Sequence, residues 1–296
     1  METGPVAEVT IASAPLRRSR RGERVRRLAQ NQLALTGALI LSIVAFAALF
    51  APYLSPNDPL EMNPTLLLQK PTAEHWMGTD EFGRDILSRV IWGARISLYV
   101  GGISVTIALV VGVSLGLIAG YYGGLVDDVI NRLLDIVFAF PTILLALGIV
   151  GMLGPSLTNT MIAIGIVYTP QYARLTRGST LSVRERDFVD AAIVAGASDP
   201  RILWSHILPN VTAPLVIQTS LSLSLAILAE ASLSFLGLGT QPPDPSWGTM
   251  VNTGQRLVEL SPWPVVFPGL AIILAVLGFN LLGDGLRDVF DPRLRV

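Results

Sequence analysis

Long apolar stretches dominate the pattern of this chain. Crossing a hydrocarbon core about 30 Å thick takes about 20 helical residues, and six stretches are long and apolar enough. We expect helices, because lipid offers no partner to open backbone groups and the apolar positions do not alternate as in barrel strands. The predicted spans cover residues 33–54, 95–120, 133–154, 157–176, 211–238 and 265–287. The predicted fold class is therefore all-α integral membrane, with six transmembrane helices.

The polar segments between these spans set the predicted domain organisation. The chain divides into a basic tail (1–32), a first span (33–54), a polar segment (55–94), a core transmembrane domain (95–289) and a short C-terminal tail (290–296). Sixteen of the 21 Lys and Arg residues fall on the side of the N-terminus, and five fall on the other side. Cytoplasmic loops carry the basic excess, so we expect both termini in the cytoplasm and segment 55–94 outside it. The predicted location is the cytoplasmic (inner) membrane, as a multi-pass protein.

Composition and charge narrow the function classes. Only 15% of residues are charged, against about 25% in soluble domains. Seven arginines lie between residues 17 and 27, beside a single acid. Such a run can bind nucleic acid, but its position just before an apolar span favours a topology anchor instead. The chain has no cysteine, which excludes disulfides, zinc–thiolate sites and cysteine nucleophiles.

Enzymatic chemistry has little support in the sequence. A phosphate-binding loop needs a lysine in G-x4-G-K-[ST], and the only lysine, Lys70, follows a glutamine. Residues 112–116 match the G-x-S-x-G nucleophile motif, but they lie within a predicted membrane helix instead of a strand-to-helix turn. The glycines there recur at spacing four (112, 116, 120), a pattern by which membrane helices approach closely. His75 and His206 fall on opposite sides of the membrane, so no metal site is expected.

A capped helix–turn–helix is predicted between the fourth and fifth spans, at 184–210. Its first helix ends at Gly196, which can adopt the left-handed conformation. Asp199 is then the N-cap of a second helix with Pro200 at its first position, and Pro209 closes that helix. Such definite start and stop signals on the cytoplasmic side suggest a rigid knob that inserts into a partner.

Several stretches resemble one family of transporters. Asp190, Ala191, Ala192 and Gly196, followed by Leu208 and Pro209, resemble the EAA motif of ABC importer permeases, with an aspartate at 190 where the family has glutamate. Five further stretches resemble the second permease of dipeptide, oligopeptide and nickel importers, the DppC/OppC type: residues 75–89, 94–98, 230–239, 242–248 and 280–288.

This resemblance implies a type I ABC importer permease that carries di- or oligopeptides and has no catalytic role. The implied partners are a sister permease, two ABC ATPase subunits, an extracytoplasmic peptide-binding protein and the lipid bilayer. ATP and magnesium would bind to the ATPases, and no cofactor to this chain. Residues 190–192, 196 and 208–209 would couple the permease to the ATPases. Nickel or glutathione is the alternative substrate, and an ion-coupled secondary carrier is the alternative mechanism.

Glu230 is the deepest acid in the predicted spans. A charged group at the bilayer centre costs roughly 2.5–3.5 kcal/mol on insertion scales, so such residues face a pathway or a partner. We therefore expect Glu230 to contact the transport pathway or another subunit. Ion-coupled carriers show internal repeats and several such acids, and this sequence has no repeat.

Overall fold

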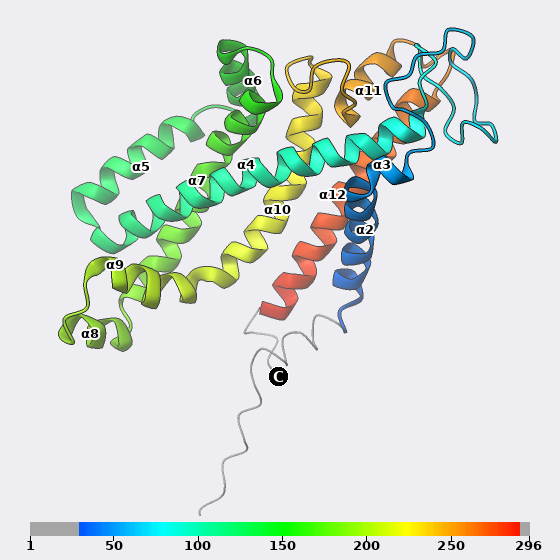
Figure 1. Cartoon of the computed structure of the whole chain (residues 1–296). Helices are drawn as coiled ribbons and strands as arrows, with labels where there is room; N and C mark the ends of the chain where they lie inside the picture. The colour runs from blue at the N-terminus through cyan, green and yellow to red at the C-terminus, as the bar shows by residue number, and fades with distance from the viewer. Residues whose placement is uncertain (1–29, 291–296) are drawn as a thin grey trace, which may run out of the picture.

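The structure, a computed structural model, describes residues 30–290, so most of the predicted basic tail and the C-terminal tail lie outside the described residues (Figure 1). In that range the chain is helical, and extended pairing is confined to an isolated bridge between Thr79 and Asp85. The helices, in chain order, are α2 (Gln32–Leu49), α3 (Ala51–Leu54), α4 (Ile86–Tyr122), α5 (Gly124–Phe138), α6 (Thr142–Leu153), α7 (Leu157–Arg184), α8 (Asp187–Val194), α9 (Asp199–Arg201), a π-helical segment (Ile202–Ile207), α10 (Leu208–Phe235), α11 (Trp247–Gln255) and α12 (Trp263–Phe290).

Four helical stretches of the described chain are long and apolar enough to cross a membrane: Gln32–Leu49, Ile86–Tyr122, Asp199–Phe235 and Trp263–Val289. The pair α5 and α6 makes a fifth span if the two helices are taken together. The segment predicted at 157–176 forms α7. This helix is long enough to cross a membrane, but it is not apolar enough to count among these stretches. The predicted helical membrane class is confirmed.

Several observed helices differ from the predicted spans, and two of the differences have a clear local cause. The straight span expected at 133–154 is wrong, because α5 and α6 meet at an angle of 88°. Pro141 is the N-cap residue of α6, and proline cannot continue the hydrogen-bonding pattern of the preceding helix. The span expected at 95–120 begins earlier, at Ile86, where Asp85 caps α4 by accepting a hydrogen bond from the backbone N–H of Ser88. At 37 residues α4 is about 55 Å long, well beyond the thickness of a bilayer core.

The glycine spacing on α4 produces a close contact with α7. A Cβ atom added at Gly112 would lie 2.6 Å from the carbonyl oxygen of Thr169, and additions at Gly116 and Gly120 would also meet α7 backbone or Cβ atoms. Tight approach of this kind places the two backbones in van der Waals contact over several turns. The helices α4 and α7 therefore form one stiff unit.

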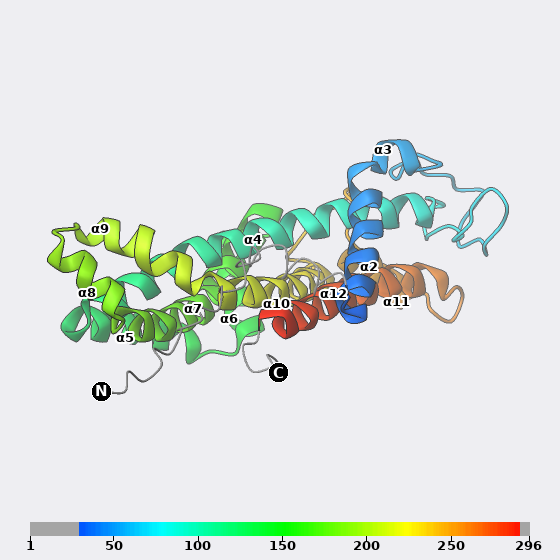
Figure 2. The same ribbon diagram turned by 90° about the horizontal axis from the view of Figure 1, so that it is seen from below.

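The helices α2 and α12 also pack together. Gly285 of α12 lies directly against Ala34 of α2, and Asn31 donates a side-chain hydrogen bond to Asp288 at 3.0 Å. The molecule is elongated in both views, with α8 and α9 at one extremity and the 55–85 segment with α11 at the other (Figures 1 and 2). The other helices lie between these two extremities.

Candidate functional site

The helix–turn–helix segment, residues 187–210, is anchored to the body of the protein along one side. Val189 of α8 is 0% exposed, and Ala192 is buried one turn further on. Three residues of the following π-helical segment join the same core cluster: Ile202, Leu203 and Ile207. Burial on this side holds the segment in a fixed position at the end of the α4–α7 unit.

The other side of α8 is exposed and apolar at its tip. Val194 is 88% exposed, and Phe188 and Ile193 are exposed as well. Asp190 and Ala191 lie on the exposed side beside them. Large apolar side chains that project from an anchored helix are typical of a surface that a partner protein buries.

The turn between the two helices has the predicted glycine geometry. Gly196 has a φ of +77°, in the left-handed region that favours glycine. Its N–H donates to the carbonyl of Ile193 at 2.9 Å, and the N–H of Ala197 donates to Ala192 at 3.0 Å. These bonds satisfy carbonyls at the end of α8, so the turn is well defined.

Two details of the predicted second helix are wrong. Ser198 is the residue that precedes the helix, and Asp199 is already its first residue. Pro209 does not close the helix, because Asp199–Phe235 runs on as one continuous stretch. A π-helical turn lies directly before Pro209, where the N–H of Leu208 bonds five residues back to the carbonyl of Leu203 instead of four.

Asp199 connects this segment to the end of α4. The hydroxyl of Tyr121 donates to its carboxylate at 2.9 Å, and the guanidinium of Arg184 lies 5.8 Å from the centre of the Tyr121 ring. The segment is therefore attached to α4 by a polar contact, and to α10 by continuity of the helix.

A polar interface that the sequence analysis missed joins α5 to α7. Arg177 binds both carboxylate oxygens of Asp127 at 2.5 Å, and Arg174 binds Asp135 at 2.6 Å. Asn131 donates to Asp127, which completes a ladder along one face of α5. The spacing of four between positions 127, 131 and 135 could have indicated this polar face of α5, since residues four apart share a helix face.

Glu230 lies inside the described chain and not on a surface. It is 0% exposed, and its two carboxylate oxygens accept hydrogen bonds from Ser97 of α4 at 3.1 Å and from Ser234 at 2.7 Å. Ser234 in turn accepts from the backbone N–H of Thr240. In this conformation the carboxylate connects α4, α10 and the following loop, and the geometry gives no support to the expected pathway or inter-subunit contact.

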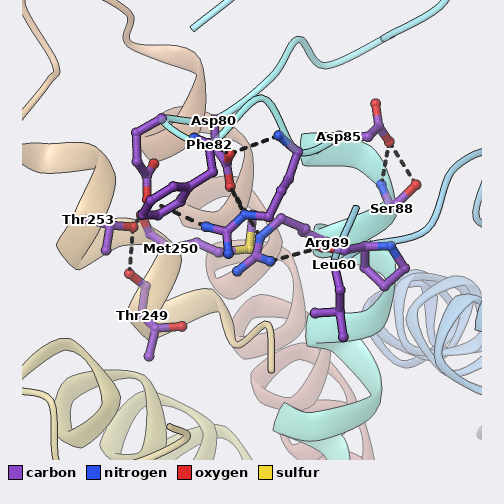
Figure 3. A network of polar contacts seen from close by, with 12 residues as sticks. Leu60, Asp80, Phe82, Asp85, Ser88, Arg89, Thr249, Met250 and Thr253 are labelled. Atoms are coloured by element: carbon purple, nitrogen blue, oxygen red, sulfur yellow. Dashed lines mark hydrogen bonds and ion pairs between the residues drawn. The ribbon is translucent and has the colours of Figure 1, made fainter. Parts of the chain in front are cut away.

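A second polar cluster lies at the opposite end of the molecule, around the start of α4 (Figure 3). Asp80 accepts from the guanidinium of Arg84 at 2.7 Å and lies 3.5 Å from that of Arg89. Asp85 accepts from Ser88 and pairs with His75 at 2.9 Å. The paired charges are buried, so the cluster organises segment 55–85.

The described residues contain no group of three or more histidines and acids placed to hold a metal ion. His75 and His206 lie in the two opposite end regions and do not meet.

Comparison with known proteins shows which family this chain belongs to. Residues 112–296 match the family described as binding-protein-dependent transport system inner membrane component, and residues 19–71 match the N-terminal TM domain of oligopeptide transport permease C. The dipeptide transport system permease protein DppC of Alkalihalophilus pseudofirmus is 50% identical over 273 residues, 92% of this chain and 90% of the relative. The glutathione transport system permease protein GsiD of Pectobacterium atrosepticum is 43% identical over 271 residues, 91% of this chain and 90% of the relative.

A solved structure shows the same fold. The chain resembles a subunit of the MetNI methionine ABC transporter in an inward-facing conformation, with a TM-score of 0.57 and 16% identity, over 70% of this chain and 98% of that one. The anchored helix–turn–helix segment and the helical membrane fold are consistent with these matches. The chain belongs to the family of binding-protein-dependent transport system inner membrane components, as a permease of the DppC/OppC type.

Proposed function

We propose that this chain is one of two membrane-spanning permease subunits of an ATP-driven importer of di- and oligopeptides. Relatives named as a dipeptide permease and as a di/tripeptide permease, at 50% and 49% identity over nine tenths of the chain, support the peptide substrate. In this proposal both termini are cytoplasmic, the protein sits in the inner membrane, and segment 55–85 lies outside.

The observation that carries the proposal is the helix–turn–helix segment. It presents an exposed apolar tip at Val194 on a helix whose other side is fixed by Val189 and Ala192. A surface of this kind suits a groove in one ATPase subunit. Asp190 would contact the ATPase where the family has glutamate.

Force applied to this segment has two routes into the membrane domain. The helix Asp199–Phe235 is continuous, so a displacement of the turn moves α10 directly. The hydrogen bond between Asp199 and Tyr121 carries the same displacement to α4, which is packed tightly on α7. ATP-driven closure of the ATPases would thus switch the membrane helices as rigid bodies between inward-open and outward-open states.

The energy for transport would come from another subunit. The sequence has no G-x4-G-K-[ST] motif, and Lys70 lies in the segment assigned to the outer side. ATP and magnesium would bind to the ATPases, an extracytoplasmic binding protein would deliver the peptide, and this chain would need no cofactor.

Reconstituted transport tests the proposal. In proteoliposomes that hold the complete importer, we expect uptake of a labelled dipeptide to require ATP on the ATPase side and to persist when a protonophore collapses the proton gradient. Uptake that needs no ATP and stops with the protonophore would instead identify an ion-coupled carrier.

A matched pair of proline variants tests the coupling role. Gly196→Pro cannot adopt the φ of +77° and loses the N–H that bonds Ile193, so we expect uptake near background while ATP hydrolysis continues. Ser198→Pro is the control, because Ser198 already has a φ of −70°. Equal uptake in the two variants would contradict the coupling role.

Glutathione is the second candidate substrate, because GsiD relatives reach 43% and 45% identity. Competition by unlabelled glutathione in the same uptake assay separates the two. We expect a dipeptide to compete and glutathione not to.

A further inference from the structure

Two glutamines meet at the seam between α7 and α10. The side-chain amide nitrogen of Gln218 donates to the amide oxygen of Gln171 at 3.3 Å and to the hydroxyl of Ser222 at 3.2 Å. One position further along each helix, the hydroxyl of Tyr172 donates to that of Thr219 at 3.2 Å. These contacts hold the two helices in one register, and we call Gln171 and Gln218 the amide pair.

The amide pair lies within the predicted hydrocarbon core. Gln171 is five residues inside the cytoplasmic boundary of the span predicted at 157–176, and Gln218 is seven residues inside that of the span at 211–238. At 1.5 Å per helical residue, these depths are about 8 and 10 Å. Both side chains are nevertheless only half-buried. Polar groups at such depth are costly against lipid, so they face another protein surface or a water-filled passage.

The amide pair keeps one donor and one acceptor free. Gln218 uses its amide nitrogen on Gln171 and Ser222, which leaves its amide oxygen as an acceptor. Neither this oxygen nor the amide nitrogen of Gln171 has a hydrogen-bond partner within residues 30–290, and neither atom is fully buried. An extended residue of a peptide presents its own N–H and C=O to the same side, which matches this combination.

A half-exposed ion pair continues the polar surface toward the cytoplasmic end of α7. Arg174, one turn from Gln171, binds Asp135 of α5 at 2.6 Å, and the two side chains are 49% and 62% exposed. The guanidinium also lies 4.0 Å from the centre of the Phe138 ring. Charges this exposed indicate contact with water, because lipid does not accept them and a dry protein interface would remove their hydration.

The bend between α5 and α6 leaves this part of the seam open. Thr142 and Ile143, in the first turn of α6, line one small pocket together with Tyr168 of α7 and Ala229 of α10. The helix α6 therefore covers the seam as far as Tyr168. Beyond it the chain turns by 88° into α5, and the amide pair is left half-buried.

We propose that the amide pair binds the peptide backbone as the substrate passes through the permease. The amide nitrogen of Gln171 donates to a peptide oxygen, and the amide oxygen of Gln218 accepts from the N–H of the same residue. In a dipeptide, the second residue offers this N–H together with a carboxylate oxygen. The backbone is common to all peptides, so neutral contacts to it serve substrates whose side chains differ in size and charge. This inference rests on the proposed function, in which a sister permease would close the other side of the passage.

Thiol labelling tests whether the amide pair faces water. The natural chain has no cysteine, so Gln171→Cys and Gln218→Cys each introduce a single thiol. Thr106→Cys is the matched control, because Thr106 is exposed on α4 between the exposed apolar side chains of Ile103 and Val110. The complete importer is placed in nanodiscs without ATP, and labelling of this chain is followed by intact mass. A charged thiol reagent should modify the two test cysteines at least about tenfold faster than the control, because a hydrated thiol ionises and reacts.

Uptake of an N-methylated dipeptide tests the ligand. Methylation of the peptide nitrogen removes the N–H that Gln218 would accept, so we compare uptake of the plain dipeptide with uptake of this analogue. Gln218→Leu should lower the ratio of the two rates by about three- to tenfold relative to the wild type, the effect of one hydrogen bond. Thr106→Val should leave the ratio unchanged. The binding protein is the same in every arm, so its own preference cancels when the ratios are compared.

The outcomes separate this inference from its alternatives. Labelling of both test cysteines at the control rate, or a crosslink from position 171 to the sister permease, would assign the amide pair to lipid or to the subunit interface and overturn the inference. An equal ratio in Gln218→Leu and the wild type would also overturn it, because a purely structural role slows both peptides alike. These results leave the proposed function intact, whereas wild-type uptake that needs no ATP would remove the proposed function and the inference together.

Discussion

Glu230 shows how one side chain joins separate parts of the membrane domain. Its carboxylate is fully buried and accepts from hydroxyls of Ser97 and Ser234, and Ser234 fixes the loop at Thr240. A buried acceptor with such partners is costly to remove, because each donor left behind keeps its desolvation penalty. Stability, and not substrate contact, is the role that this geometry supports.

Replacing Glu230 by alanine should therefore destabilise the protein by about 2–4 kcal/mol, since two hydroxyls lose their acceptor and a cavity forms. Glu230→Gln keeps an acceptor oxygen of similar shape and should recover most of the loss. Thermal unfolding of the purified chain in detergent measures both, with Glu259→Ala, at an exposed acid, as the control. Identical unfolding temperatures for the alanine variant and the wild type would show that the contacts are unimportant.

At the scale of elements, α4 and α7 act as one unit because the glycines of α4 let the backbones touch. Gly116 lies against Ala173 and Thr176, so an added methyl group has no space there. Gly178 of α7 has no atom within 4 Å of an added Cβ. The same substitution at these two positions thus probes packing and helix propensity separately.

Gly116→Ala should destabilise the chain by about 1–3 kcal/mol through overpacking. Gly178→Ala should be neutral or stabilising by up to about 1 kcal/mol, because alanine favours a helix more than glycine does. Unfolding by heat or by denaturing detergent gives the sign of each change. Destabilisation of equal size at both positions would mean that the contact between α4 and α7 is not the cause.

The elements that the sequence predicted well are those fixed by local rules. The left-handed turn at Gly196 depends only on neighbouring residues and backbone sterics. The glycine spacing on α4 predicts a close helix contact without saying which helix is the partner. Pro209 was misread because the π-helical turn before it, which lets the helix continue, is stabilised by burial of Ile202 and Ile207 in the core.

Contacts between segments that are distant along the chain could not be predicted from the sequence. Asp127 and Arg177 are 50 residues apart, and nothing in the spacing of either helix pairs them. Burial of Glu230 was missed for the same reason, since Ser97 lies 133 residues away.

The whole molecule has two chemically distinct ends. One end carries α8 with its exposed apolar tip, and the other carries the buried charge cluster at the start of α4. Figure 1 shows α8 and segment 55–85 at opposite extremities. The helices between them provide continuous paths from end to end, through α4 and through Asp199–Phe235. An importer needs this arrangement, because the subunit that supplies energy and the protein that delivers substrate act on opposite sides of the membrane.

Crosslinking from single cysteines tests this arrangement most directly, because the natural chain has no cysteine. Val194→Cys marks the tip of α8, and Met152→Cys marks an equally exposed position at the end of α6. In the assembled importer a short thiol-to-amine crosslinker should join position 194, but not 152, to an ATPase subunit. If position 194 gave no ATPase crosslink, or reacted with a membrane-impermeant maleimide from outside intact cells, the coupling role of residues 187–210 would be contradicted.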